Sequence, residues 1–256
     1  MQMPNLKNNE FQMISDILLE LYSMNDLKEI EHHFLMNVRA LIPYNQSNFR
    51  AVSPDSGEVL KDGTVFIDTD AAMIPVFFHN IEPEKNYLKN LFNYRESIVY
   101  NETDLLDEDV RKNTEFYRDY LLPQKIPYSC GIILIEEEKL IGVISIFRSR
   151  EWGDFTEKEL FILNIFKNHL TKIIMRCLQR QKQTIVFEDS NLTPREREIA
   201  EMIFSDVPNF NIAQMLYISA NTLKKHSSNI YKKLGVSSRN QLRQMLSEIG
   251  DMGEES

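Results

Sequence analysis

In this sequence of 256 residues, one long stretch contains lysine and arginine residues but no acidic residue. No Asp or Glu occurs from Val207 to Ser247, although the whole chain has a formal net charge of -9. The cationic residues of this stretch are Lys224, Lys225, Lys232, Lys233, Arg239 and Arg243. A surface with cations and no carboxylates attracts phosphate, so the stretch indicates a nucleic-acid partner although the chain as a whole is acidic.

A predicted helix over 220–234 would separate these cations from an apolar face. At about 100° per residue, Leu223, Ile230 and Leu234 fall within about 40° of one another. The residues on the opposite side of the predicted helix are Asn221, Lys224, Lys225, Ser228 and Lys232. A helix in the DNA major groove needs an apolar back that holds it and a front of cations and short polar groups.

Local signals predict a bundle of four helices around this segment. A Ser, Thr or Asn before a helix accepts a hydrogen bond from its first turn, and Gly often follows its end. Thr193 and Glu196 have the spacing of a capping box, with Pro194 at the first helical position. The other residues predicted to start or end these helices are Asn209, Ser219, Gly235 and Ser237.

These residues resemble the LuxR-type helix-turn-helix over roughly residues 190–248. The resemblance is carried by Leu192-Thr193-Pro194-Arg195-Glu196-Arg197-Glu198, Asn211-Ile212-Ala213, Leu216, Ile218-Ser219, Thr222-Leu223-Lys224, His226, Lys233-Leu234-Gly235-Val236 and Ser238-Arg239. The Gly that is usual in the turn before the second helix is replaced within Asp206-Val207-Pro208-Asn209.

The resemblance implies an all-α domain of four helices over 191–249 that binds a double-stranded DNA operator. It implies that Lys224, Lys225 and Ser228 face base edges. The residues that it implies as phosphate contacts are Asn211, Asn221, Thr222, Lys232 and Arg239. Since one such helix reads about half a site, we expect a homodimer on a two-fold operator.

Apolar spacing predicts helices and strands before this domain. Residues 8–41 have helical periodicity with a break after Met24, and strands are predicted over 48–53 and 59–67. A β-hairpin is predicted from strands over 130–135 and 140–147. A long helix over 157–183 is predicted to begin with a capping box, in which Thr156 is the N-cap and Glu159 lies three positions on.

The region from Glu29 to Lys182 resembles a GAF-like sensor domain. The resemblance is carried by Leu41-Ile42-Pro43-Tyr44-Asn45, Gly131-Ile132-Ile133-Leu134, Leu140-Ile141-Gly142-Val143-Ile144-Ser145-Ile146-Phe147-Arg148 and Asp154-Phe155-Thr156. It implies a six-stranded antiparallel sheet flanked by helices, often with a small-molecule pocket. The fold class expected for the chain is therefore α+β, with a sensor domain over 1–183 and a linker over 184–190, where periodicity is weak.

Aromatic residues are concentrated between 77 and 128 and could line a pocket for a small-molecule signal. The candidate ligand contacts are Tyr87, Phe92, Tyr94, Tyr100, Phe116, Tyr117 and Tyr128. Packing of these rings in the core is the alternative. The acyl-homoserine lactone branch of the LuxR family has a characteristic Trp in its pocket. Because Trp152 is the one Trp here and falls in a predicted loop, that ligand class is not expected.

The long helix offers two interpretations. Leu163, Phe166, Leu170, Ile173 and Cys177 recur at three- and four-residue spacing, as in a coiled-coil seam. The stripe is therefore a candidate dimer contact and a rod that transmits the signal. The alternative is that every apolar face of this helix belongs to the core of its own subunit.

Composition bounds the function classes. Two cysteines, no apolar leader and no membrane-length apolar run predict a cytoplasmic protein. No Gly-rich phosphate loop or metal-ligand cluster occurs, so neither an enzyme nor a cofactor is predicted. We expect a sequence-specific transcriptional regulator, in which a small molecule repositions the DNA-binding domains of a dimer. The alternatives are a sensor domain that binds a protein or peptide, and an enzyme fused to a DNA-binding anchor.

Overall fold

The computed structural model describes residues 4–82 and 88–248. Side chains are described for the same residues except 61–62, 182–189 and 246–248. The chain forms two compact units that divide between Cys177 and Leu178. Tyr87, one of the predicted ligand contacts, lies outside the described residues.

An antiparallel sheet forms the centre of the N-terminal unit. Its strands are β1 (Gln46–Val52), β2 (Val59–Ile67), β3 (Ile98–Asn101), β4 (Tyr128–Glu136) and β5 (Lys139–Arg148). They lie in the order β2-β1-β5-β4-β3, and each neighbouring pair is antiparallel. The predicted sheet flanked by helices is confirmed, but the described residues hold five strands, not the six that the GAF-like resemblance implies. After β2, the chain turns into the short helix α3 (Ile74–Asn80).

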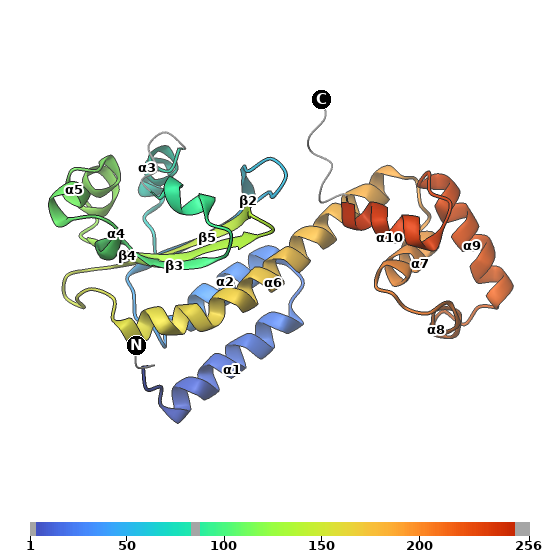
Figure 1. Ribbon diagram of the computed structural model, residues 1–256, viewed down its shortest axis with the longest axis horizontal. Coiled ribbons are helices and arrows are strands. Elements are labelled where there is room, and N and C mark those ends of the chain that lie inside the picture. The colour runs from blue at the N-terminus through green and yellow to red at the C-terminus, as the bar shows by residue number, and fades with distance from the viewer. Residues whose placement is uncertain (1–3, 83–87, 249–256) are drawn as a thin grey trace. The chain divides into compact units, whose positions relative to one another are not determined.

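Helices cover both faces of this sheet (Figure 1). On one face lie α1 (Asn8–Ser23), α2 (Leu27–Val38) and α6 (Glu157–Asp189). On the other face lie α3, α4 (Glu102–Leu105) and α5 (Glu108–Lys112), with the helical turns η1 (Ala71–Met73), η2 (Lys89–Asn93) and η3 (Tyr117–Leu121) in the same connections. The predicted break between the first two helices is confirmed, and the Asp26 side chain caps α2 by accepting a hydrogen bond from the Glu29 amide.

The apolar stripe of α6 belongs to the core of its own unit. Leu163, Phe166, Leu170 and Ile173 are 0% exposed, and Cys177 is 1% exposed. The Phe166 ring contacts the Phe34 ring of α2 at 5.3 Å between centroids. The predicted dimer seam on this stripe is therefore wrong, because the sheet and α2 already cover it. Core packing, the alternative interpretation, holds for this stripe, whereas Phe161 and Ile165 on other sides of the helix are half-buried.

The start of α6 was predicted correctly and its end was not. Thr156 and Glu159 form the expected capping box, since the Thr156 amide donates to the Glu159 carboxylate at 2.8 Å and the Glu159 amide donates to Thr156 Oγ1 at 3.3 Å. Residues 184–189, predicted as an irregular linker, are helical up to Asp189. No Pro or Gly occurs between Gly153 and Pro194, so nothing in the backbone forces the helix to end earlier.

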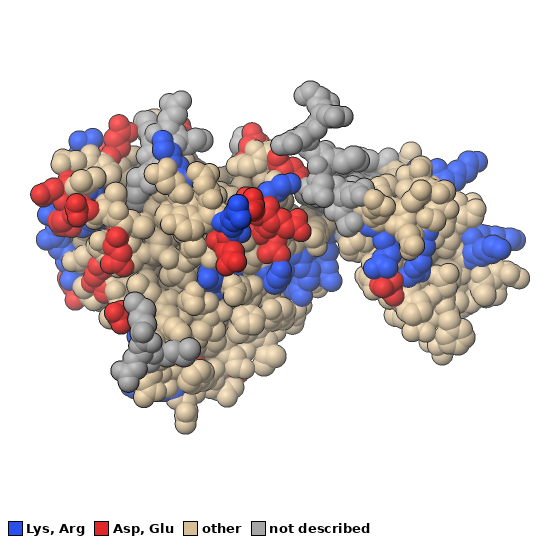
Figure 2. Space-filling view, in the orientation of Figure 1, with Lys and Arg blue, Asp and Glu red and all other residues tan. Residues whose placement is uncertain are grey.

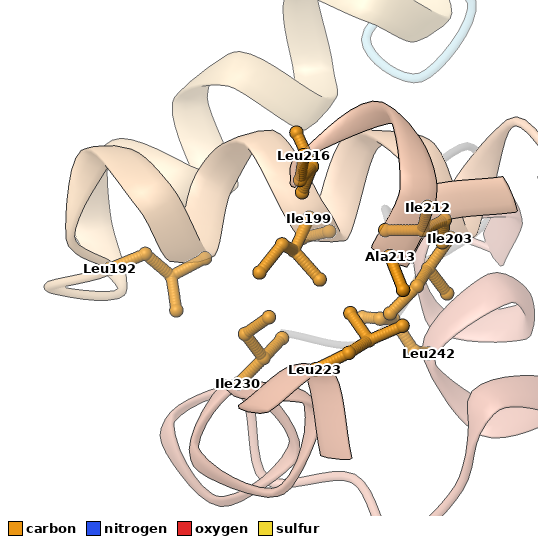
Figure 3. Packing of buried hydrophobic residues seen from close by; sticks show 10 residues of the cluster. Leu192, Ile199, Ile203, Ile212, Ala213, Leu216, Leu223, Ile230 and Leu242 are labelled. Atoms are coloured by element: carbon orange, nitrogen blue, oxygen red, sulfur yellow. The ribbon is translucent and has the colours of Figure 1, made fainter. Parts of the chain in front are cut away.

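The C-terminal unit contains the predicted four helices, α7 (Pro194–Phe204), α8 (Asn209–Met215), α9 (Ala220–Lys233) and α10 (Arg239–Glu248). Apolar side chains from all four helices converge in one core (Figure 3). The buried members are Leu192, Ile199, Ala200, Ile203, Ile212, Ala213, Leu216, Leu223, Ile230 and Leu242. This core fixes the rotation of α9, because Leu223 and Ile230 must point into it.

Two of the predicted caps in this unit are each wrong by one residue. Pro208 stands at the N-cap of α8, and Asn209 is the first helical residue. The Asn209 side chain instead accepts a hydrogen bond from Arg239 at 2.7 Å. Before α10, Ser238 Oγ accepts from the Gln241 amide at 3.1 Å, whereas Ser237 Oγ donates to the Gln241 side chain. Thr193, Ser219 and the left-handed Gly235 are confirmed in their predicted places.

Candidate nucleic-acid interface and ligand site

The orientation of α9 follows from its cap and its apolar side. Ser219 Oγ accepts a hydrogen bond from the Thr222 amide at 3.1 Å and satisfies one of the free donors of the first turn. Leu223, Ser227 and Ile230 are the buried residues of the helix. The opposite side therefore faces solvent, and it is the side on which the lysines occur.

The predicted base-reading residues share one exposed face. Lys224, Lys225 and Ser228 are exposed, as are Asn221 and Lys232 beside them. None of these three lysines forms an ion pair with any residue that the structure describes. Figure 2 shows lysine and arginine atoms gathered on the C-terminal unit, with few acidic atoms beside them. Their charges are thus available to an external anion.

Lys233 differs from the other lysines of α9 because its charge stabilises the fold. Its ammonium group donates to Glu196 at 2.6 Å and to the Asn191 carbonyl at 3.1 Å. Burial by itself raises the pKa of Glu196, but the hydrogen bonds from Lys233 and Thr193 outweigh it and hold the pKa below its ordinary value. One contact thus ties the end of α9 to the start of α7.

The predicted phosphate contacts are less uniform than the base-reading set. Asn211 is exposed on α8, and Thr222 is half-buried with its hydroxyl 2.8 Å from that of Ser219. Arg239 is half-buried, and it donates to the Val207 carbonyl at 2.7 Å as well as to Asn209. Its guanidinium therefore holds the loop between α7 and α8, and a phosphate contact by Arg239 stays a prediction.

A second group of polar side chains lies in the N-terminal unit, on the sheet face that α3 and η3 cover. Tyr100 of β3 reaches across β4 and donates to Ser145 Oγ of β5 at 3.1 Å. The strand between them carries Gly131, where an added Cβ would lie 3.0 Å from the Tyr100 ring and 1.9 Å from the Ile144 carbonyl oxygen. Only glycine leaves room for this crossing. Burial raises the pKa of Tyr100 to about 12, so the phenol stays protonated.

Asn48 is the unusual member of this group. It pairs with Ser145 across the β1–β5 ladder and is 0% exposed. Neither its side-chain oxygen nor its side-chain nitrogen has a hydrogen-bond partner among the described residues. Asn80 of α3, which is 2% exposed, uses its nitrogen on the Val76 carbonyl and leaves its oxygen without a partner. A buried amide without partners costs a few kcal/mol, and a polar group placed beside it would offset that cost.

The structure brings only some of the predicted aromatic contacts to this face. Phe116 and Tyr117 are buried in a ring cluster, and the Phe116 ring stacks on Tyr120 at 5.1 Å. Tyr100 lies on the polar part of the same face. Phe92 packs on the same face, against a cluster that includes Tyr100 and Ile133. Tyr94, by contrast, is 51% exposed, and Tyr128 is half-buried at the start of β4. The candidates therefore do not line one common surface.

Sequence reasoning missed the polar residues of β1. Gln46, Asn48 and Arg50 alternate along this strand and so share the face that α3 covers. Arg50 is 4% exposed, and its guanidinium lies 5.0 Å from the Phe77 ring centroid. Polar residues at every second position of a strand predicted to lie within a sheet are a signal that could have revealed this site.

The described residues contain no cluster of three or more potential metal ligands. Within the same ranges, no helix combines the length and apolarity that crossing a membrane requires.

Comparisons with known proteins match both parts of the chain. The model of the family described as bacterial regulatory proteins, luxR family, matches residues 190–246. The spore germination protein GerE of Bacillus subtilis is 41% identical over 61 residues, which are 24% of this chain and 82% of GerE. The monoamine regulon transcriptional regulator of Klebsiella aerogenes is 26% identical over 166 residues, 65% of this chain and 69% of that protein.

Among solved structures, Escherichia coli SdiA is similar over 96% of this chain and 99% of its own, with a TM-score of 0.48 and 17% identity. A GAF domain from an Acinetobacter phosphoenolpyruvate-protein phosphotransferase is similar over 66% of this chain and 95% of its own, with a TM-score of 0.48 and 14% identity.

Proposed function

The chain belongs to the LuxR family of bacterial regulatory proteins and is a transcriptional regulator with a sensor-like N-terminal unit. From that premise we propose that α9 reads one half of a two-fold DNA operator in a homodimer. We further propose that a small molecule, bound on the α3 side of the sheet, changes the DNA affinity. Lys224, Lys225 and Ser228 are assigned to base edges, and Asn211, Asn221, Thr222, Lys232 and Arg239 to phosphates.

The observation that carries the DNA-binding proposal is the exposed, carboxylate-free face of α9. Lys224, Lys225 and Lys232 stand on it without ion-pair partners among the described residues. An exposed lysine with no acid nearby supports phosphate binding, because no internal ion pair has to break when the phosphate arrives. Lysine also suits the O6 and N7 acceptors of guanine, and Ser228 supplies a short hydrogen-bonding group beside it.

The test uses the full chain and an operator selected from random duplexes by the unmodified protein. Replacing Lys224 and Lys225 together with Ala should weaken binding about a hundredfold, because each good base contact is worth about 1–3 kcal/mol. The matched control is Lys28→Ala with Lys89→Ala, which removes the same charge from exposed positions of the N-terminal unit. Equal binding by both double variants would remove the α9 assignment.

A salt titration of the unmodified protein tests the electrostatic part separately. The logarithm of affinity should fall by about 0.9 for each decade of salt and each phosphate contacted. A flat response would contradict a phosphate-facing surface.

The proposal of a small-molecule signal rests on Asn48. Its amide is 0% exposed and has no hydrogen-bond partner among the described residues, so a molecule that satisfies it has to be enclosed together with it. A small polar molecule with both a donor and an acceptor would satisfy both amide atoms. Asn80 and the Tyr100–Ser145 pair supply further polar groups on the same face. These groups favour a polar ligand over a purely apolar one.

The signal can be sought without knowing its identity. The purified full chain is denatured and its supernatant is analysed by mass spectrometry, alongside a thermal-shift screen against small polar metabolites. We expect a compound that raises the Tm of the unmodified protein and leaves that of Asn48→Leu unchanged. A compound that shifts both proteins equally would place the ligand elsewhere, and a response only to a peptide or protein would favour the rival sensor.

The dimer needs a surface other than the buried stripe of α6. Two-fold operators are read by two copies, and each copy contributes one recognition helix. Sedimentation of the chain on a two-half-site operator should show two copies, about 60 kDa of protein in all, given 30.1 kDa per chain. One copy per complete operator would refute the dimer.

A further inference from the structure

A groove of about 850 Å³ lies between α8 and α9 and opens to solvent. Phe210, Ala213 and Gln214 of α8 line it on one side. Lys224, Ser228 and Tyr231 of α9 line it on the other. Lys224 and Ser228 are two of the three residues to which base contacts are assigned. The groove is thus continuous with the proposed DNA-reading face.

Phe210 is conspicuous in this groove because 77% of it is exposed. It lies in the first turn of α8, whose buried residues are Ile212 and Ala213. Since these two residues turn the apolar side of α8 toward the core, the Phe210 ring on another side of the helix does not join that core. Apolar residues that line the groove beside it include Ala213, Ile218 and Leu223. Removing the ring from water there would stabilise a complex.

We propose that Phe210 is a DNA-contacting residue. The inference rests on the proposed DNA-reading role of α9. When α9 enters the major groove, the Phe210 ring packs on a C–H surface of the strand that Lys224 and Ser228 contact. That surface is a thymine methyl group or a deoxyribose. Apolar contacts of this kind discriminate between bases without hydrogen bonds.

The charge around the groove favours DNA as its occupant. No acidic residue occurs between Val207 and Ser247, and the Lys224 ammonium borders the groove. In DNA, thymine methyl groups and sugars lie close to phosphates. The groove offers the matching groups, since apolar side chains line it and the Lys224 ammonium lies beside them. A protein partner in the same groove would cover Lys224 and Ser228 and compete with DNA.

The test compares Phe210→Ala with the unmodified full chain on the selected operator, at several salt concentrations. We expect an affinity loss of about tenfold with an unchanged salt slope, because an apolar contact releases no counterions. Most of the Phe210 surface is already in solvent, so the fold should tolerate the change, and an unchanged Tm confirms this. The matched control is Met215→Ala, which removes another exposed apolar side chain of α8, 58% exposed, outside the groove. It should bind like the unmodified protein.

Uracil substitution separates the two possible surfaces. Replacing thymines by uracil one at a time removes single methyl groups from the operator. If the ring contacts a methyl group, one substitution weakens the unmodified protein and leaves Phe210→Ala unaffected. If it contacts deoxyribose, no substitution has this effect, but Phe210→Ala still binds more weakly. Either pattern supports the proposal.

Two results would overturn the inference without touching the proposed function. One is a Phe210→Ala protein that binds the operator as tightly as the unmodified chain. The other is a Met215→Ala protein that loses as much affinity as Phe210→Ala. By contrast, an unmodified chain that binds no duplex selectively would defeat the proposed function itself.

Discussion

The two faces of the sheet in the N-terminal unit are equally closed to solvent but differ in chemistry. Toward α1, α2 and α6 the strands present apolar side chains, and Phe49, Ile144 and Ile146 are 0% exposed. Toward α3 and η3, the same strands present Asn48, Arg50 and Ser145, none of which is more than 4% exposed. Successive side chains of a strand point to opposite faces of the sheet. Neighbouring residues of one strand therefore lie in different environments.

The difference separates stability from recognition. Burial of apolar side chains stabilises a fold, by about 25 cal/mol for each Å² removed from water. Burial of an amide without partners lowers stability by about 1–3 kcal/mol. The first face therefore stabilises the unit by apolar packing. The second combines apolar clusters around Phe77 and Ile133 with the Asn48 amide, which lowers stability and is suited to a polar molecule. Four substitutions test this contrast.

Phe166→Ala should have the largest effect, because it opens a cavity on the apolar face. We expect the free energy of unfolding to fall by about 3–5 kcal/mol, measured by denaturant titration of the full chain. Because Phe166 is 0% exposed, the association state should not change. The control is Phe161→Ala, a half-buried ring of the same helix, which should cost much less. Equal costs at the two positions would contradict the burial of the stripe.

Glu31→Gln should have the next largest effect, since Glu31 is the acid buried at the apolar face. Burial raises its pKa to about 9, which the Ala51 amide and the Lys28 charge offset only in part. The ordinary pKa is 4.5, so between that pH and about 9 the unfolded chain releases a proton that the folded chain retains. Stability should therefore fall as pH rises through this window.

Glutamine cannot ionise, so Glu31→Gln should remove this pH dependence and stabilise the protein by about 3 kcal/mol at pH 7. Thermal unfolding of both proteins at several pH values checks the gain in stability and the loss of pH dependence. Glu29→Gln, an exposed neighbour on α2, should keep the dependence of the unmodified chain. A pH profile that Glu31→Gln leaves unaltered would refute the assignment.

Asn48→Leu should increase the stability of the ligand-free protein by about 1–2 kcal/mol, because it replaces an amide without partners by an apolar group. The same change should abolish the ligand response described above, while operator binding without ligand persists. Denaturant titration measures the first effect, and binding to the operator measures the last. A clear loss of stability would show that the Asn48 amide has partners after all.

Ser145→Ala should have the smallest effect. It removes the acceptor of the Tyr100 hydroxyl, and a lost neutral hydrogen bond costs about 1 kcal/mol. Tyr100→Phe should cost a similar amount, and the double variant should cost little more than either single one. Additive losses would show that the two hydroxyl groups act independently.

The features predicted correctly depend on neighbours in the sequence. The capping box of Thr193 and Glu196, the Ser219 cap and the left-handed Gly235 each involve residues within one or two helical turns. Such contacts form wherever the local sequence occurs, so the four-helix unit could be predicted almost complete. The errors at Asn209 and Ser237 were single-residue shifts, because a neighbouring residue, Pro208 or Ser238, took the cap position.

The features predicted wrongly or missed depend on contacts distant in the sequence. The spacing of the apolar residues in α6 predicts which side of the helix is apolar, but it does not predict which elements cover that side. In the structure, α2 and the sheet cover it. The side chain of Arg239 reaches a loop about thirty residues earlier, which no local pattern indicates. The aromatic residues over 77–128 do not indicate the polar face of β1, because Asn48 meets Ser145 only through the β1–β5 pairing.

The unbroken course of α6 has a consequence for where the two units divide. The helix runs over 33 residues, Glu157–Asp189, and the division after Cys177 falls inside it. A helix of this length is about 50 Å long, and only its two ends leave backbone groups without partners inside the helix. The boundary between the units therefore lies in regular secondary structure, where the backbone amides and carbonyls are hydrogen-bonded, and not in a loop.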